Sequence, residues 1–145
     1  MKAIVNWVVL ANARTAEVFE NRGPGKGLVE KSDICWHSES PAAPRDKAGR
    51  GHNIAGPGIA AVERADPQHQ SDIRFAKDIS NHLLKAHSDK AFDRLIIVAG
   101  PHMLGLLRAC MDERLKMATV AEIAKDLSAQ PTEAIETHIG EFIAV

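Results

Sequence analysis

The segment Asp93–Ala99 has the sequence DRLIIVA, which ends in one of the longest apolar runs of the chain. A strand that helices cover on both faces has such a near-continuous run of branched apolar residues, whereas a strand with one face in water alternates. Gly100 and Pro101 follow directly, and such a pair ends a strand. We therefore expect residues 93–99 to form the central strand of a sheet with helices on both sides.

Hydrophobic periodicity and turn residues predict the elements around this strand. In chain order they are strands at residues 3–11, 14–20 and 28–37, a helix of about twenty residues from Asp66-Pro67, a helix over 103–111, a short amphipathic piece around Leu115, a strand at 119–124 and a final helix from Pro131. The third strand alternates imperfectly, so we expect its outer half to overhang an edge of the sheet. Because tight turns join the first three strands and helices join the later ones, the expected architecture is α/β, a mixed five-stranded sheet with helices on both faces, in one domain spanning residues 1–145.

Capping residues and apolar spacing predict the long helix that begins at Asp66-Pro67 and the final helix that begins at Pro131. Asp66 is a candidate N-cap carboxylate, and Pro67 occupies the first helical position, where no N–H group is needed. Both helices are expected to lie against the sheet through one apolar face. In the final helix that face would consist of Ile135, His138, Ile139 and Phe142.

The two tryptophans and the two cysteines are expected to serve packing. Trp7 and Trp36 lie in the first and third predicted strands, where core or edge packing is their simplest role. Cys35 and Cys110 form no Cys-x-x-Cys motif and no regular Cys/His spacing, which argues against a disulfide framework and a structural zinc site. We expect both thiols to be buried and reduced.

The overall composition is that of an ordinary globular protein. The 145 residues include 18 basic and 19 acidic side chains, so the formal net charge of -1 supplies no global field for nucleic acid or membrane. Aromatic residues make up 4% and tyrosine is absent, which argues against a stacking platform for single-stranded nucleic acid. No apolar run approaches the roughly 20 residues that span a bilayer, and we find no signal-peptide core. We expect a cytoplasmic protein without a membrane span.

Residues 38–65 lack periodicity and contain four of the ten glycines and three of the seven prolines. They predict a long loop, and loops of this length in compact domains are usually functional or disordered. Glycines at 49 and 51 would let backbone amides approach phosphates closely. The candidate RNA or phosphate contacts in this loop are Arg45, Lys47, Arg50, His52 and Arg64. A solvated surface loop is the alternative, because a lone Gly-Arg-Gly lacks the P-loop pattern.

Gly100 and His102 are the candidates for a small anion pocket. They stand at the carboxyl end of the central strand, where open α/β sheets usually place ligands, and a helix N-terminus at that point would favour an anion. The alternative for His102 is an ordinary first-turn residue that faces solvent. The histidines show no metal-ligand spacing and Gly-x-Ser-x-Gly is missing, so we assign no metal, no cofactor and no catalytic residue.

Four stretches of the chain resemble a bacterial family called host attachment protein, or "protein required for attachment to host cells". They are NWVVLANARTAEVFE, ADPQHQSDIRFAKDI, FDRLIIVAGPHMLGLLRACM and VAEIAKDLSAQP, which occur in the family's order and spacing. The resemblance implies a single small α/β domain and a role in attachment to host surfaces. It carries no assigned catalytic residues to this chain.

A more distant resemblance is to the middle domain of eukaryotic and archaeal class-1 peptide release factors. That domain has a basic loop with the motif Gly-Gly-Gln, then a helix that opens with Arg-Phe, then a strand that ends in Ala-Gly. Residues 48–53 (AGRGHN), Arg74-Phe75 and residues 95–100 (LIIVAG) occupy the corresponding places. The resemblance implies the sheet order 3-2-1-4-5 of the ribonuclease H architecture. Because His52 and Asn53 replace Gly-Gln, it does not carry over peptidyl-tRNA hydrolysis.

Three functional hypotheses follow. The leading one is a non-enzymatic protein of the host attachment family that acts indirectly through macromolecular contacts with an unknown protein partner. The alternative is an RNA- or ribosome-associated module that uses residues 45–64. The third is a small anion-binding enzyme at the corner formed by Gly100, Pro101 and His102. An exposed apolar edge on the third strand would also allow a homodimer.

Overall fold

The computed structural model describes residues 4–39, 67–143 and 145. The elements in chain order are β1 (Asn6–Ala11), β2 (Thr15–Asn21), β3 (Val29–His37), α3 (Pro67–Ser88), β4 (Arg94–Ala99), α4 (Pro101–Cys110), α5 (Glu113–Ala118), β5 (Thr119–Ile123) and α6 (Thr132–Ile139). Every predicted element is present, in the predicted order. Pro67 is the first residue of α3, as expected, whereas its predicted N-cap Asp66 lies outside the described residues.

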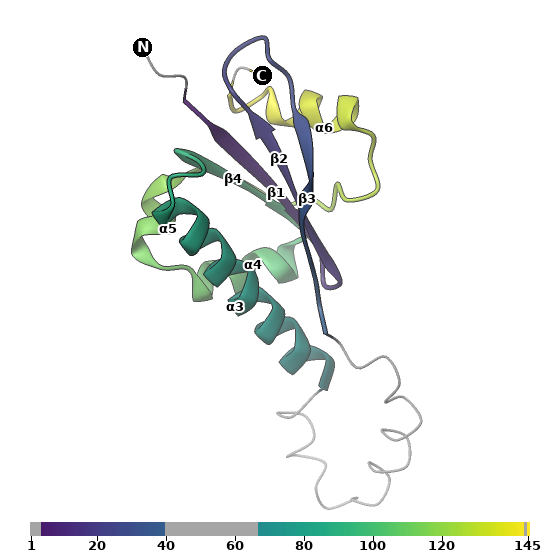
Figure 1. Cartoon of the computed structure of the whole chain (residues 1–145). Helices are drawn as coiled ribbons and strands as arrows, with labels where there is room; N and C mark the ends of the chain where they lie inside the picture. The colour runs from purple at the N-terminus through teal and green to yellow at the C-terminus, as the bar shows by residue number, and fades with distance from the viewer. Residues whose placement is uncertain (1–3, 40–66, 144) are drawn as a thin grey trace, which may run out of the picture.

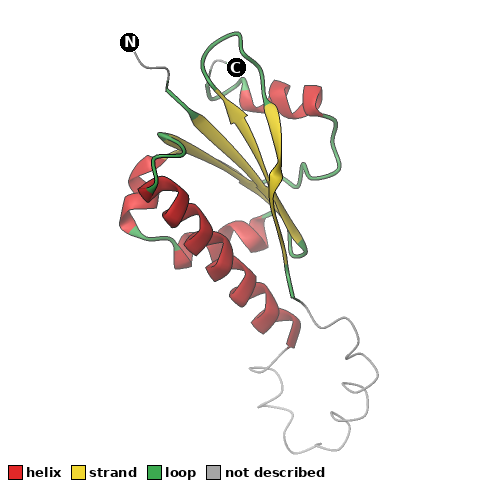
Figure 2. Ribbon diagram, viewed as in Figure 1, coloured by secondary structure: helices red, strands yellow, loops and turns green. Residues whose placement is uncertain are grey.

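The strands form one mixed sheet with the order β3-β2-β1-β4-β5. β2 pairs antiparallel with β1 and β3, whereas β4 pairs parallel with β1 and β5. α3, α4 and α5 cover one face of the sheet and α6 covers the other, which makes three layers (Figures 1 and 2). The predicted sheet order and the helices on both faces are confirmed.

β4 is buried on both of its faces, as its apolar run predicts. Leu95 and Ile97 belong to the core under α3 and α4, and Ile96 and Val98 belong to the core under α6. None of the four is more than 1% exposed. Successive side chains of a strand point to opposite faces. An apolar run without alternation therefore supplies both cores from one strand.

α3 packs on the sheet through a single apolar stripe. Phe75, Ile79 and Leu83 are almost completely buried, and Arg74 and Lys77 on the other side are exposed. The helix is thus amphipathic, as most surface helices of globular proteins are. Within the described ranges, no helix has the length and apolar character needed to cross a membrane.

Both edge strands of the sheet carry register irregularities. β3 shifts its register against β2 between Glu17 and Phe19, and β5 shifts against β4 between Leu95 and Ile96. Irregular edges are poor templates for a further strand. β3 lies at an edge, as its imperfect alternation predicts, and none of its residues is fully buried. The homodimer through this strand stays a prediction.

Of the apolar face predicted for the final helix, Ile135 and Ile139 are confirmed and Phe142 is wrong. Ile135 and Ile139 are at most 1% exposed and fill the core on that side of the sheet. Phe142 is 51% exposed, because α6 ends at Ile139 and the chain leaves the helical stripe before it reaches residue 142. His138 is half-buried.

Phe75 offers a direct test of the core between α3 and the sheet, because it is 2% exposed. We expect Phe75→Ala to lower the free energy of unfolding by about 3–5 kcal/mol, since the truncation leaves a cavity in a packed core. Urea denaturation measures the change. The matched control is Val29→Ala at a side chain 61% exposed, which should stay within about 0.5 kcal/mol of wild type. A loss of less than about 1 kcal/mol for Phe75→Ala would contradict this packing.

Candidate functional site

The carboxyl end of the sheet is where the sequence places ligands, and several chain segments meet there. β1, β4 and β5 are parallel, so their last residues Ala11, Ala99 and Ile123 lie at this end. β3 also ends here, because it is antiparallel to β2, and α3 and α4 both begin here (Figure 1). The chain leaves β1 toward β2 on one side and β4 toward β5 on the other, and ligands of open α/β sheets bind at such a reversal of strand order.

Gly100 and His102 occupy the first turn of α4 at this end. Gly100 is the N-cap residue, with φ -61° and ψ 163°, and Pro101 takes the first helical position. The side chain of His102 is 59% exposed, and its Nε2 lies 3.1 Å from Oδ2 of Asp72 on α3. The structure therefore brings the predicted histidine against a carboxylate that the sequence analysis did not single out.

Asp72 is the buried member of this pair. Its side chain is 7% exposed, and Oδ1 accepts a hydrogen bond of 2.8 Å from Nε2 of Gln68, one turn earlier on α3. The ring centroid of His69 lies 5.8 Å from that of His102. A buried carboxylate is costly unless it is paired and hydrogen-bonded. Gln68 and His102 supply those bonds, and the contact with Oδ2 of Asp72 orients the imidazole.

An imidazole that is oriented by a carboxylate can hold a ligand or transfer a proton through its other ring nitrogen. The same carboxylate reduces the attraction of the corner for an anion, because it brings a negative charge to within 3.1 Å of the imidazole. The anion pocket at Gly100 and His102 therefore stays a prediction. One sequence signal points to Asp72, since it occupies a position on the apolar stripe of α3 that includes Ile79 and Leu83.

A polar recess of about 520 Å3 lies between the first half of α3 and the end of β3. The hydroxyl oxygens of Ser38 and Ser71 are 3.4 Å apart on its wall. The lining residues are Ser38, Glu39, Ser71, Arg74, Phe75, Lys77, Asp78 and Asn81. Sequence reasoning did not find this recess, because its two walls come from segments on either side of residues 40–66.

A second hydrogen-bonded group at the carboxyl end ties β1 to the turn after β5. Nδ2 of Asn12 donates to Oγ of Ser128 at 3.1 Å, and Oγ of Ser128 donates to Oδ1 of Asp126 at 2.6 Å. The hydroxyl and the backbone N–H of Ser128 hold the pKa of the Asp126 carboxyl below its usual range. Oδ1 of Asn12 also accepts from the backbone of the β1–β2 turn. This group links the end of β1 to the turn after β5.

Another recess, of about 580 Å3, lies along β5 at the far edge of the sheet. Nε of Arg108 donates to Oε1 of Glu122 across it at 2.6 Å. Its lining residues are Arg108, Met111, Lys116, Thr119, Val120, Ala121 and Glu122. None of the residues that the sequence singles out lies in its lining.

The predicted basic contacts lie outside the described residues. They are Arg45, Lys47, Arg50, His52 and Arg64. The residues that flank them, Glu39 after β3 and Pro67 at the start of α3, both stand at the carboxyl end of the sheet. The segment that carries these side chains therefore leaves and re-enters the described fold at the same end as His102.

The prediction that both cysteines are buried is wrong for Cys35. This thiol is free and exposed because β3 is an edge strand, and its sulfur lies 4.0 Å from Nε2 of His37. Partial burial and the carboxylates of Glu17 and Glu30 raise the pKa of Cys35. Cys110 is also free and is half-buried. Over the described ranges, no three His, Cys, Asp or Glu side chains are grouped so that they could hold a metal ion.

The sequence matches, over residues 7–139, a family that is described as "Protein required for attachment to host cells". The chain belongs to this family. A search of curated proteins finds no match. The host attachment family that the four sequence stretches indicate is thus confirmed. The likeness to release-factor middle domains and to the ribonuclease H architecture stays a prediction, because a shared sheet order does not carry a function.

The pair of Asp72 and His102 can be tested through stability. We expect His102→Ala to lower the free energy of unfolding by about 1 kcal/mol, because the buried carboxylate loses one of its two hydrogen-bond partners. Urea denaturation measures the change, and Glu141→Ala at an exposed position is the control. Equal stability of His102→Ala and wild type would show that the pair contributes nothing to the fold.

Proposed function

We propose that this member of the host attachment family acts by binding another macromolecule at the carboxyl end of the sheet. The observation that carries the proposal is the convergence there of β3, α3 and α4, which brings His102 and the polar recess to the end where residues 40–66 are attached. Segments that a rigid sheet and its helices hold in place are a common location for binding residues. Residues 45–64 contain four cations, at 45, 47, 50 and 64, against Asp46 and Glu63, so this stretch has a net charge of +2 in a chain of net charge -1.

We further propose that the role in attachment is indirect and is exercised inside the cell. Cys35 is a free thiol on an exposed edge strand, and Cys110 is also free. Exposed free thiols persist in reducing compartments, whereas secreted proteins of this size usually pair their cysteines or lack them. The observation supports a cytoplasmic protein whose partner is an intracellular macromolecule.

The proposal is tested by complementation of a strain that lacks the gene. The variant Arg45/Lys47/Arg50/Arg64→Ala should restore fewer attached cells per host cell than wild type, because it removes the charges that would contact the partner. The matched control, Arg22/Lys26/Arg94/Arg114→Ala, removes three arginines and one lysine that are exposed and lie away from the carboxyl end. We expect the control to restore attachment fully.

A second arm separates a direct from an indirect role. Purified protein added outside the deletion strain should leave attachment low, because the proposed partner is inside the cell. Rescue by added protein would contradict the indirect role. Equal complementation by the two charge variants would contradict contact through the carboxyl end.

Binding to RNA or the ribosome is the second candidate, and one observation favours it. Arg74 and Lys77 are exposed on α3 beside the polar recess, at the end where the basic segment is attached. Four cations on the phosphates of a single strand would give a slope of log affinity against log salt of roughly -3. Such a contact would be moderate and sensitive to salt.

Sedimentation with ribosomes from the organism's own lysate tests this candidate. We expect wild type to co-migrate with ribosomes at low salt and to dissociate at moderate salt, because phosphate contacts weaken with salt. The Arg45/Lys47/Arg50/Arg64→Ala variant should stay at the top of the gradient, and the Arg22/Lys26/Arg94/Arg114→Ala control should behave as wild type. Wild type that sediments as free protein at both salts would rule out the ribosome and leave a protein partner.

A further inference from the structure

The contact between α3 and α4 at the carboxyl end of the sheet brings two histidines together. His69 and His102 have ring centroids 5.8 Å apart, with the ring planes inclined by 40°. Both residues are exposed, and they come from the first turns of two helices that begin at the same end of the sheet (Figure 1). Asp72 lies one helical turn after His69 and is buried beside His102. The structure therefore gathers two imidazoles and one carboxylate where solvent reaches both rings.

The two imidazoles have different surroundings. Nε2 of His102 lies 3.1 Å from Oδ2 of Asp72, and an ionised carboxylate can only accept, so Nε2 is the donor and Nδ1 is left for a ligand. Asp72 also compensates a positive charge on that ring. His69 forms no ion pair with a carboxylate among the described residues. This difference suits one ring to donate a proton and the other to accept one, as general acid–base catalysis requires.

A nucleophile for such a reaction has to come from the substrate or from water. Within the described parts of the chain, neither a hydroxyl nor a thiol is hydrogen-bonded to His69 or His102. The hydroxyl of Ser71, next to Asp72 in sequence, lies 3.4 Å from that of Ser38 instead. Two imidazoles alone can move protons, so they serve a substrate that carries its own nucleophile. RNA is such a substrate, because every phosphodiester has a 2′-hydroxyl beside it.

We propose that His69 and His102 cleave single-stranded RNA. His69 accepts the proton of a 2′-hydroxyl, whose oxygen forms a bond to the adjacent phosphorus. The bond from that phosphorus to the 5′-oxygen breaks, and protonated His102 gives its proton to the leaving oxygen. One product ends in a 2′,3′-cyclic phosphate and the other begins with a 5′-hydroxyl. Both rings return to their first protonation states by exchange with water, so no further reactant is needed.

The distance between the rings fits this division of labour. A catalytic nitrogen reaches an oxygen about 2.6–3.2 Å away. Rings with centroids 5.8 Å apart can therefore serve two oxygens of one phosphodiester, the attacking one and the leaving one. Asp72 does not touch the substrate. It is a positioning residue, which holds the imidazole of His102 in one orientation.

The first turn of α4 supplies donors for the phosphate. The first hydrogen bond of this helix runs from the N–H of Leu104 to the carbonyl oxygen of Gly100 at 2.9 Å, so the N–H groups of His102 and Met103 precede it. Gly100, the N-cap residue, has no side chain to cap them. N–H groups at a helix N-terminus attract phosphate. When His102 is protonated, its charge offsets that of Asp72, which removes the repulsion between the carboxylate and the RNA.

This inference rests on the second candidate above, because cleavage requires RNA at the carboxyl end of the sheet. It adds a reaction to that contact, and the two histidines and Asp72 all lie outside residues 40–66. Binding and cleavage must therefore be measured separately, so that the failure of one is distinguished from the failure of the other.

The experiment incubates the full chain with a fluorescein-labelled single-stranded RNA of mixed sequence in the presence of EDTA and follows cleavage by gel electrophoresis. We expect wild type to give products that end in a 2′,3′-cyclic phosphate, which mass spectrometry identifies. DNA of the same sequence should stay intact, because it lacks the 2′-hydroxyl. His69→Ala and His102→Ala should each lower kcat about a hundredfold or more, since each removes one proton transfer.

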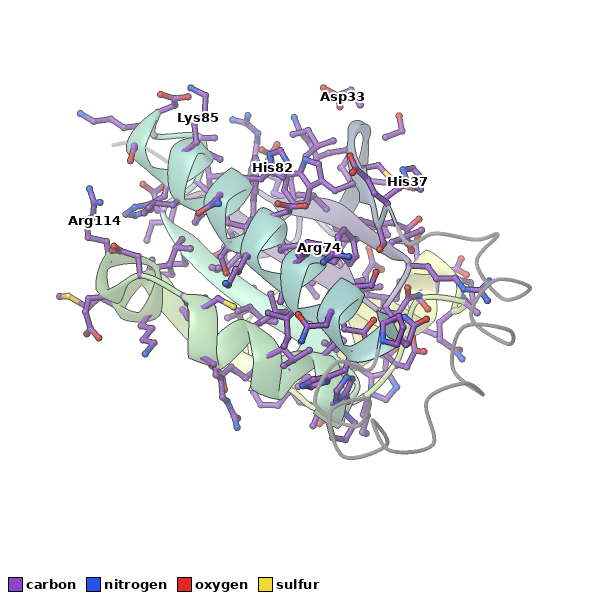
Figure 3. The ribbon with its side chains drawn as sticks, turned by 90° about the horizontal axis from the view of Figure 1, so that it is seen from below. Asp33, His37, Arg74, His82, Lys85 and Arg114 are labelled. Carbon is purple, nitrogen blue, oxygen red and sulfur yellow. The ribbon has the colours of Figure 1, made fainter. Side chains whose placement is uncertain are left out.

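His82→Ala is the matched control. It also removes an exposed histidine of α3, about 20 Å farther along the helix axis than His69. His82 faces β3 (Figure 3), where its ring stacks on that of Trp36 with centroids 4.8 Å apart. We expect this variant, purified in the same way, to cleave RNA as wild type does.

Asp72→Asn tests the positioning role. We expect it to lower kcat about tenfold or more, because the imidazole of His102 loses the carboxylate that orients it. KM should stay within about twofold of wild type, since Asp72 does not contact the RNA. A variant that is damaged only in its folding would show less active protein in its urea transition.

Binding is measured in parallel by fluorescence anisotropy with the 2′-O-methyl form of the strand, which cannot react. RNA that is bound and not cleaved overturns this inference and leaves the second candidate in place. RNA that is neither bound nor cleaved overturns both. Cleavage that persists in His69→Ala and His102→Ala also overturns the inference. Cleavage that both variants lose and His82→Ala keeps, with every variant folded in its urea transition, supports it.

Discussion

The rest of the structure depends on the burial of β4 from both sides. Leu95 and Ile97 need one layer of helices and Ile96 and Val98 need another, so this strand cannot lie at an edge or face water. Its parallel pairing with β1 and β5 then requires helical crossovers, which in such sheets are right-handed and lie over the faces. The same parallel pairing aligns the carboxyl ends of three strands and leaves that end free for side chains that bind ligands.

α3 connects the buried sheet to the candidate site. One face of the helix packs on the sheet, and its first turns contribute side chains to the site. Its apolar stripe of Phe75, Ile79 and Leu83 packs on the sheet, and the stripe ends in the buried carboxylate of Asp72. A charge at the border of a core is tolerated only where hydrogen bonds compensate it, here those from Gln68 and His102. Departures from a regular apolar pattern that are compensated in this way are expected at functional sites.

The edge strand β3 is exposed to solvent, and side-chain contacts with α3 hold its end in place. Its register against β2 is interrupted, and its thiol at Cys35 is open to solvent. The stack of Trp36 on His82 nevertheless ties the far end of the strand to α3, and Ser38 approaches Ser71 just beyond it. An irregular edge strand is a poor template for a further strand. It is free to form one wall of the polar recess.

The sequence by itself determined the order and type of the elements, because apolar periods of two and of 3.6 residues are local properties of a chain. DRLIIVA predicted an interior strand that is covered on both faces, and Pro67 predicted the start of α3. The four stretches that resemble the host attachment family predicted the membership that the match over residues 7–139 shows. The resemblance to release-factor middle domains implied the strand order that the sheet has.

Of the candidate site, the sequence located Gly100 and His102 at the end of β4, since the glycine and proline that end a buried strand can be recognised in the sequence. Only the tertiary structure paired His102 with Asp72, 30 residues away, stacked Trp36 on His82, and exposed Cys35 and Phe142. These contacts depend on how α3 crosses the sheet and on the residue at which each element ends. A local sequence pattern specifies neither of these.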